Sequence, residues 1–120
     1  RKAIQINGLT ADEIEKRRAG TRYPKLFRKD RSSFLRFCKG TNLFAAYNID
    51  FDAAFAKLSS KNTRWFCVMR NSMAVLNYGS YPKLEDAAQK FGISVDGKRT
   101  HDSMYDTELC LAILNKMLVK

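Results

Sequence analysis

Apolar residues in the second half of the chain follow the spacings of alternating strands and helices. Two continuous apolar runs, residues 41–48 (TNLFAAYN) and residues 63–71 (TRWFCVMRN), are typical of strands that are buried on both faces of a sheet. Between these runs, residues 50–58 (DFDAAFAKL) place Phe51 and Phe55 on one face of a helix. The pattern therefore predicts a strand, a helix and a second strand in this order.

Three further helices are predicted after the second strand. Residues 71–79 (NSMAVLNYG) continue directly from it, and Pro82 is suited to open a helix over residues 83–92. Residues 103–118 show the longest helical periodicity. The side chains of the last two helices that we expect to face inward are Leu84, Ala87, Ala88, Phe91, Leu109, Cys110, Ile113, Leu114 and Met117. Strands that alternate with helices predict an α/β fold with parallel strand pairing.

The N-terminal residues carry a different set of signals. Residues 2–8 alternate in the manner of an edge strand. Residues 9–20 have the start signals of a helix, because Thr10 is placed to cap it and Glu13 follows three positions later, as in a capping box. We therefore expect an edge strand followed by a capped helix.

A basic loop and a short helix are expected next. Residues 21–31 are rich in Lys and Arg and surround Pro24, which favours a loop. Residues 32–40 (SSFLRFCKG) predict a short helix with Ser32 or Ser33 as its cap, ended by a glycine.

The predicted sheet is too small to satisfy its own backbone. Two central strands and one partial edge strand leave rows of N–H and C=O groups without partners. The chain also begins at Arg1, next to the predicted edge strand. From both observations we expect an N-terminal segment, preceding this chain, that completes the sheet.

Length and composition indicate one globular domain over residues 1–120. The chain is 45% hydrophobic and 28% charged, which is typical of a folded protein. No apolar run approaches the roughly 18 residues that a membrane span needs, and no signal-peptide pattern opens the chain. Cys38, Cys67 and Cys110 lack C-x-x-C spacing, so we expect reduced thiols in a cytoplasmic protein that does not enter membranes.

Positive charge is concentrated near the N-terminus. The net charge is +10, and residues 1–40 hold twelve Lys or Arg against four acidic residues. Within residues 16–39 aromatic side chains are interleaved with the basic ones, a composition that suits either a solvated surface or a phosphate-binding face. The candidate nucleic-acid backbone contacts are Arg17, Arg18, Arg22, Lys25, Arg28 and Lys29.

Two acidic positions have chemistry that a core does not explain. Asp106 lies in line with the apolar stripe of the last helix, five residues after His101, the single histidine of the chain. An ionised carboxylate there needs a hydrogen bond, a counter-charge or a metal ion, although Ser103 and Asp106 also have the spacing of a capping box. Asp50 and Asp52 follow the first central strand, at the edge where open α/β sheets bind ligands, and either residue could instead cap the next helix.

These two segments together resemble the DnaQ-like 3′–5′ exonucleases, the DEDD superfamily whose last motif contains a histidine. The family's last motif, H-x-x-x-x-D, is matched by residues 101–106 (HDSMYD), and its middle motif, H-N-x-x-F-D, by residues 47–52 (YNIDFD), with Tyr47 in the common histidine position. Residues resembling three other family segments occur in the same order, at 6–10 (INGLT), 64–70 (RWFCVMR) and 83–93 (KLEDAAQKFGI). The resemblance covers nearly the whole chain.

The resemblance implies a function and a set of roles. It implies a metal-dependent 3′–5′ exonuclease in which two divalent ions, Mg²⁺ or Mn²⁺, clamp the scissile phosphate of DNA or RNA. Asp52 and Asp106 would be metal ligands, and His101 would be the general base that takes a proton from the attacking water. Asn48 and Phe51 would contact the nucleotide at the 3′ end.

The chain departs from the family at its first motif. That motif, D-x-E, supplies two of the four metal carboxylates from the central strand, and no segment here matches it. The resemblance therefore implies a ribonuclease H-like three-layer fold, with a mixed central sheet flanked by helices, that lacks its N-terminal strands. Residues 1–120 would be the C-terminal part of a single exonuclease domain. A non-catalytic nucleic-acid-binding module and a polymerase-associated subunit remain alternatives, and a homodimer is compatible with the resemblance.

Overall fold

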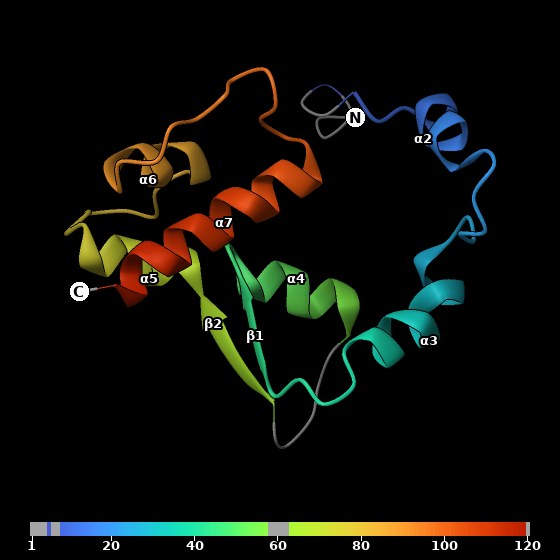
Figure 1. Cartoon of the computed structure of the whole chain (residues 1–120), viewed down its shortest axis with the longest axis horizontal. Helices are drawn as coiled ribbons and strands as arrows, with labels where there is room; N and C mark the ends of the chain where they lie inside the picture. The colour runs from blue at the N-terminus through green and yellow to red at the C-terminus, as the bar shows by residue number, and fades with distance from the viewer. Residues whose placement is uncertain (1–4, 6–7, 58–62, 120) are drawn as a thin grey trace. The chain divides into compact units, whose positions relative to one another are not determined.

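From residue 42 onward, the computed structural model places a strand, a helix, a second strand and then three successive helices (Figure 1). It describes residue 5 and residues 8–57 and 63–119. These residues form α2 (Ala11–Arg18), α3 (Phe27–Phe37), β1 (Leu43–Ala46), α4 (Ile49–Ala56), β2 (Arg64–Cys67), α5 (Val68–Val75), α6 (Leu84–Lys90) and α7 (Ser103–Leu118). The chain divides into two compact units, Arg1–Thr41 and Asn42–Lys120.

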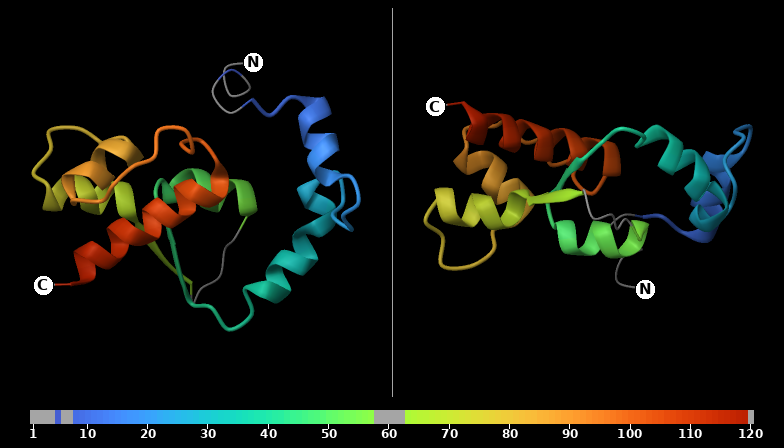
Figure 2. Two further views of the ribbon diagram at one scale, coloured as in Figure 1. Left: turned by 45° about the horizontal axis from the view of Figure 1, so that its top comes forward. Right: turned by 90° about the horizontal axis from the view of Figure 1, so that it is seen from below.

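The second unit is built on a small parallel sheet. β1 and β2 pair in parallel, so the predicted α/β class with parallel pairing is confirmed. Phe44 and Trp65 are partners in the register, and their rings stack with centroids 5.2 Å apart. Figure 2 shows α4 and α7 on opposite sides of the two strands. The register and the ring stack together describe how the two strands are aligned side by side.

Burial of the first strand differs from the sequence prediction. Exposed and half-buried residues alternate along β1, and Leu43 retains 49% of its accessible surface. An apolar run is buried on both sides only if both faces of the sheet are covered. Within the described residues, the face that carries Leu43 and Ala45 is left partly open to solvent, so the prediction of two-sided burial is wrong for this strand.

The core of the second unit lies where α7 packs against α5 and α6. Its buried side chains come from all three helices: Val68, Ala87, Ala88, Tyr105, Leu109 and Ile113. The side chains expected to face inward from the last two helices are all in this core or packed against it. The helical periodicity of residues 83–92 and 103–118 therefore predicted both the helices and their buried faces.

α4 turns its aliphatic face inward and leaves the face with the two phenylalanines exposed. Phe51 and Phe55 retain 70% and 66% of their surface, whereas Ile49 and Ala56 are buried. Apolar residues occupy both faces of this short helix, so periodicity alone did not select one. The aliphatic face packs against the strands and the aromatic face is left exposed.

In the first unit, α2 confirms the predicted cap only in part. The N–H of Glu13 donates to Oγ1 of Thr10 at 3.1 Å. The carboxylate of Glu13 accepts from Arg17 at 2.8 Å instead of returning to the backbone of the cap residue. The reciprocal half of the capping box is therefore replaced by an ion pair within the helix.

α3 begins at Phe27, inside the segment predicted as a basic loop, and its N-cap is Leu26 rather than Ser32 or Ser33. Lys and Arg are good helix formers, and Phe27 lies two turns from Phe34, where their rings meet edge to face at 5.6 Å. This contact stabilises the first turns of the helix. The edge strand predicted over residues 2–8 lies, apart from Gln5 and Gly8, outside the described residues.

None of the helices in the described part of the chain combines the length and the apolar character that crossing a bilayer requires.

Removal of a core side chain tests the packing of α7. Ile113 is fully buried, so we expect Ile113→Ala to lower the free energy of unfolding by about 2–5 kcal/mol. Leu118 lies exposed at the end of the same helix, and Leu118→Ala should cost less than about 1 kcal/mol. Urea unfolding followed by circular dichroism measures both values. Equal losses would show that α7 does not pack through Ile113.

Candidate functional site

Asp52 lies in the first turn of α4, just past the carboxyl end of β1. The carbonyl of Asn48, at the N-cap position, accepts hydrogen bonds from the N–H groups of Phe51 at 3.1 Å and of Asp52 at 3.4 Å. This turn holds the Asp52 backbone directly after the strand. None of the ion pairs formed by the described residues involves Asp52.

The neighbours of Asp52 are open to solvent. The side chain of Asn48 is exposed and makes no capping hydrogen bond, and the ring of Phe51 is largely exposed. Asp50 lies on the surface and forms an ion pair with Arg70. Of the two aspartates after β1, Asp52 is therefore the one free to bind a ligand, with an amide and an aromatic ring beside it in sequence.

His101 and Asp106 are joined by a hydrogen bond through the backbone. The N–H of His101 donates to Oδ1 of Asp106 at 3.2 Å. His101 has a φ of 67°, in the left-handed region, and this conformation ends the loop before α7. Asp106 thus holds the backbone of His101 with Oδ1, and among the described residues no hydrogen bond to its Oδ2 atom is found.

Asp102, not Ser103, caps α7. Its Oδ1 atom accepts from the N–H of Tyr105 at 3.1 Å. The interpretation of Ser103 and Asp106 as a capping box is therefore wrong. The cap lies one residue earlier, and the Asp106 carboxylate accepts a hydrogen bond from the His101 N–H. Aspartate is a strong N-cap, so the sequence did contain the signal for Asp102.

Tyr105 anchors the loop that carries His101. Its ring is buried, and its hydroxyl accepts a hydrogen bond from the N–H of Asp96 at 2.7 Å. The guanidinium carbon of Arg99 lies 4.4 Å from the centroid of this ring. The Nη2 atom of Arg99 also lies 3.7 Å from Oε2 of Glu108 on α7. The hydrogen bond of Tyr105 to Asp96 and the two contacts of Arg99 therefore hold residues 96–101 against the first turns of α7. The sequence did not single out Tyr105, because its role depends on this fold of the loop.

Both candidate carboxylates hold their negative charge less readily than free aspartates do. Burial raises the pKa of Asp52 above its ordinary value of 3.8, although the residue is exposed on one side. Burial also raises the pKa of Asp106, and the hydrogen bond and positive charge from His101 oppose that effect only in part. A bound cation would lower the pKa of both groups, which suits carboxylates that bind metal ions.

The thiol of Cys110 lies within the electrostatic reach of Asp52. Burial raises the pKa of its thiol to about 11, and the nearby charge of Asp52 contributes to this increase. Cys110 follows Asp106 by one turn of α7, about 6 Å along the helix axis. Asp52 on α4 therefore acts on α7 about one helical turn after Asp106. The sequence placed Cys110 only in the core.

The described residues do not by themselves make a complete metal site. Within residues 8–57 and 63–119, no three His, Cys, Asp or Glu side chains gather closely enough to hold a metal ion. Asp52 and the Oδ2 atom of Asp106 offer oxygen ligands of the kind that Mg²⁺ and Mn²⁺ prefer. They fit part of the ligand set that the resemblance implies, and further carboxylates would be needed for two ions.

Tyr47 ties the end of β1 to the segment before α6. Its hydroxyl donates to the carbonyl of Pro82 at 2.6 Å. Burial raises the pKa of this hydroxyl strongly, so Tyr47 stays neutral at physiological pH. Tyr47 occupies the motif position where the DnaQ-like exonucleases commonly have histidine. Here its side chain makes a structural hydrogen bond instead.

The candidate basic contacts lie in the first unit, within or around α2 and α3. Arg17 and Arg18 pair with Glu13 and Glu15 inside α2. The other four are exposed, in the segment between the two helices or on α3: Arg22, Lys25, Arg28 and Lys29. Arg17 and Arg18 are therefore paired with carboxylates, whereas the other four form none of the ion pairs found among the described residues.

Removal of one hydroxyl tests the anchor of the His101 loop. Tyr105→Phe leaves the Asp96 N–H without its acceptor, so we expect a loss of about 0.5–1.5 kcal/mol in stability and faster hydrogen exchange at Asp96. Tyr81 is exposed, and Tyr81→Phe is the matched control that should change neither quantity. Unchanged exchange at Asp96 in Tyr105→Phe would contradict the anchoring role.

The thiol of Cys110 reports on the position of Asp52. Because the charge of Asp52 disfavours the thiolate, Asp52→Asn should lower the pKa of Cys110 from about 11. Alkylation requires the thiolate, so below that pH Cys110 should react about two- to tenfold faster, the effect of one partly screened charge. The measurement is the pH profile of alkylation at Cys110, resolved from Cys38 and Cys67 by mass spectrometry.

Asp50→Asn is the control for this experiment, because Asp50 lies in the same turn of α4 but pairs with Arg70. It should leave the alkylation profile of Cys110 unchanged. Equal acceleration by both substitutions would mean that Asp52 has no special proximity to α7.

Comparison of the chain with protein-family models, with curated proteins and with solved structures finds no match. The basis for a function is therefore the chemistry of the residues and their placement.

Proposed function

We propose that the chain forms part of a metal-dependent 3′–5′ exonuclease that hydrolyses phosphodiester bonds of DNA or RNA. The observation that carries this proposal is the placement of an exposed carboxylate, Asp52, and a half-buried one, Asp106, in the first turns of α4 and α7, of which Asp106 also bonds to the only histidine of the chain. The pKa of both carboxyls is raised by burial, an arrangement typical of groups that bind a cation or take part in catalysis.

Each residue has a role that its surroundings support. Asp52 and Oδ2 of Asp106 are the metal ligands, and divalent ions held there would neutralise charge on the scissile phosphate and favour ionisation of the attacking water. Oδ1 of Asp106 positions the His101 backbone, while the exposed imidazole accepts the proton from that water. Phe51 and Asn48 face solvent beside Asp52, where a terminal base could stack and form hydrogen bonds.

The remaining metal carboxylates would come from outside residues 1–120. The resembling family uses a D-x-E pair on a strand, and we propose that such a strand, on a preceding or separate segment, pairs with the sheet. This strand would also give the ribonuclease H-like fold its mixed central sheet. The exonuclease would then be assembled only when both parts are present.

One observation favours a second candidate function, a nucleic-acid-binding module without catalysis. No group of three possible metal ligands gathers within the described residues, and exposed basic side chains occur in and before α3. Such a module would bind polynucleotides in a salt-sensitive way, and chelators would not affect it.

A reconstitution experiment tests the exonuclease. Residues 1–120, joined to or mixed with an upstream segment that carries D-x-E, should shorten a 5′-labelled single strand from its 3′ end in Mg²⁺. EDTA should stop the reaction, His101→Ala should lower the rate about 10²- to 10⁴-fold, and Asp106→Asn should abolish it. Asp50→Asn is the matched control and should retain activity, because Asp50 is paired with Arg70 on the surface.

Two outcomes would contradict this assignment. If residues 1–120 alone degrade single strands at a normal rate and His101→Ala does not slow them, His101 is not the general base. If the reconstituted protein binds strands without cutting them in any divalent metal, the non-catalytic module is the better description.

A further inference from the structure

The described helices of the first unit, α2 and α3, differ in their unpaired charge. α2 carries three acidic residues and three basic ones, and its last turn is basic while its first turn is acidic. Arg17 lies 2.8 Å from Glu13, and Arg18 pairs with Glu15. α3 carries four basic residues and a single acidic one. The positive charge of the N-terminal region is therefore neutralised on α2 and left unbalanced on α3.

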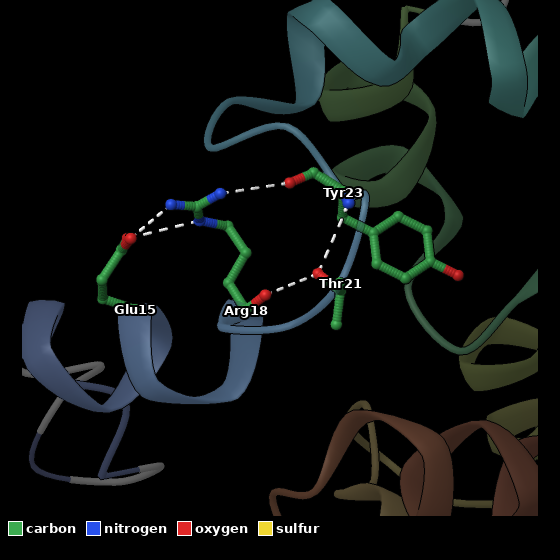
Figure 3. A network of polar contacts seen from close by, with 4 residues as sticks. All are labelled: Glu15, Arg18, Thr21 and Tyr23. Carbon is green, nitrogen blue, oxygen red and sulfur yellow. Dashed lines mark hydrogen bonds and ion pairs between the residues drawn. The ribbon is translucent and has the colours of Figure 1, made fainter.

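Arg18 is further occupied by the turn that follows α2 (Figure 3). Its guanidinium donates to the carbonyl of Tyr23 at 3.4 Å, and the hydroxyl of Thr21 donates to the Arg18 carbonyl at 2.6 Å. The hydrogen bond from Arg18 lowers the pKa of Glu15, so this acidic partner stays ionised. Arg18 thus holds the end of α2 and is a poor candidate for contact with an external anion.

Basic side chains of α3 share one face. At 100° per residue, Arg28, Lys29 and Arg36 fall within an arc of about 100°, and Lys39 follows directly after the helix. All four are exposed, and none of the ion pairs formed by the described residues involves them. They form what we name the α3 basic face.

An aromatic ring borders the α3 basic face. Phe37 retains 87% of its surface, the largest exposure of any apolar side chain in the described residues. Phe27 and Phe34 occupy the opposite face, where they are half-buried and contact each other. The end of the helix therefore presents Arg36 next to an accessible ring, which lies about 80° around the helix from Lys29.

We infer that the α3 basic face binds the phosphate backbone of a single-stranded polynucleotide, with Phe37 stacking on one of its bases. Charge complementarity favours a polyanion, because Arg28 and Arg36 are about 12 Å apart along the helix axis, a span that covers more than one phosphate. Exposed aromatic rings next to cations are the combination that binds single strands without sequence preference.

An anionic membrane surface fits the helix less well. Interfacial helices need a continuous apolar face opposite the charges. On α3 the two phenylalanines of that face are half-buried and contact each other, and Arg31 lies about 40° from Phe27 on the helical wheel. The surface therefore favours a polynucleotide over lipid.

This binding site goes beyond the proposed catalytic site, because it needs neither a metal ion nor Asp52 or Asp106. It also narrows the set of basic residues taken from the sequence. Arg28 and Lys29 stay in the site, Arg36 and Lys39 join it, and the residues of α2 leave it.

The test measures binding of residues 1–120 to a fluorescein-labelled oligothymidylate by anisotropy, in EDTA so that no hydrolysis occurs. Arg28→Gln with Lys29→Gln should weaken the affinity about tenfold or more at low salt. It should also reduce the slope of log K against log salt by roughly 1.4, or 0.7 for each lost phosphate contact. Phe37→Ala should weaken binding about fivefold or more without changing the slope, since stacking is not ionic.

The matched control removes the same number of charges from the neighbouring helix. Arg17→Gln with Arg18→Gln should change the affinity by less than about twofold, because both side chains are paired within α2. Circular dichroism of each variant confirms that the helices are retained. Equal weakening by the two double substitutions would overturn the inference, since it would show an effect of net charge alone.

Two further outcomes also overturn it. Tighter binding to phosphatidylserine-containing vesicles than to the oligonucleotide would make α3 a membrane contact. Loss of oligonucleotide binding on Asp106→Asn would place the strand at the candidate metal site instead. Because the assay contains EDTA, failure of this inference leaves the exonuclease proposal untouched, and inactivity of the reconstituted enzyme leaves this inference untouched.

Discussion

The packing of α7 against α5 and α6 is the constraint on which the candidate site depends. Ile113 and Leu109 are buried in this contact, and the first turn of α7 is consequently held in one position and rotation. That turn carries Asp106, whose Oδ1 atom bonds to the His101 backbone. Burial of apolar side chains two turns away thus determines where a carboxylate and an imidazole can act.

Hydrogen bonds around Tyr105 convert this packing into a defined loop. The phenol hydroxyl accepts from the Asp96 backbone, and the Asp102 carboxylate caps the helix on the other side. His101 can then adopt a left-handed conformation that an unsupported histidine would rarely occupy. The imidazole stays exposed while its backbone is fixed, a combination suited to proton transfer with solvent.

The two units use charge in different ways. In the second unit, burial raises the pKa of two carboxyl groups, and a bound cation would lower it again. In the first unit, α2 neutralises its charges internally while α3 leaves them exposed. The proposed binding of a polynucleotide by α3 and the proposed binding of metal ions by the carboxylates can each be measured without the other.

Periodicity in the sequence determined the α/β class, the parallel strands and the buried faces of α6 and α7, because apolar residues recur at helical spacing along one side of each helix, as Leu109, Ile113 and Met117 do on α7. It did not determine the inward face of α4, which has apolar residues on both sides, or the start of α3, where the Phe27–Phe34 contact outweighs a loop-like composition. Motif spacing singled out His101, Asp106 and Asp52. Only the tertiary structure decided that Cys110 lies under the influence of Asp52 and that Tyr105 binds the Asp96 backbone, because burial and hydrogen bonds there join residues whose spacing carries no such signal.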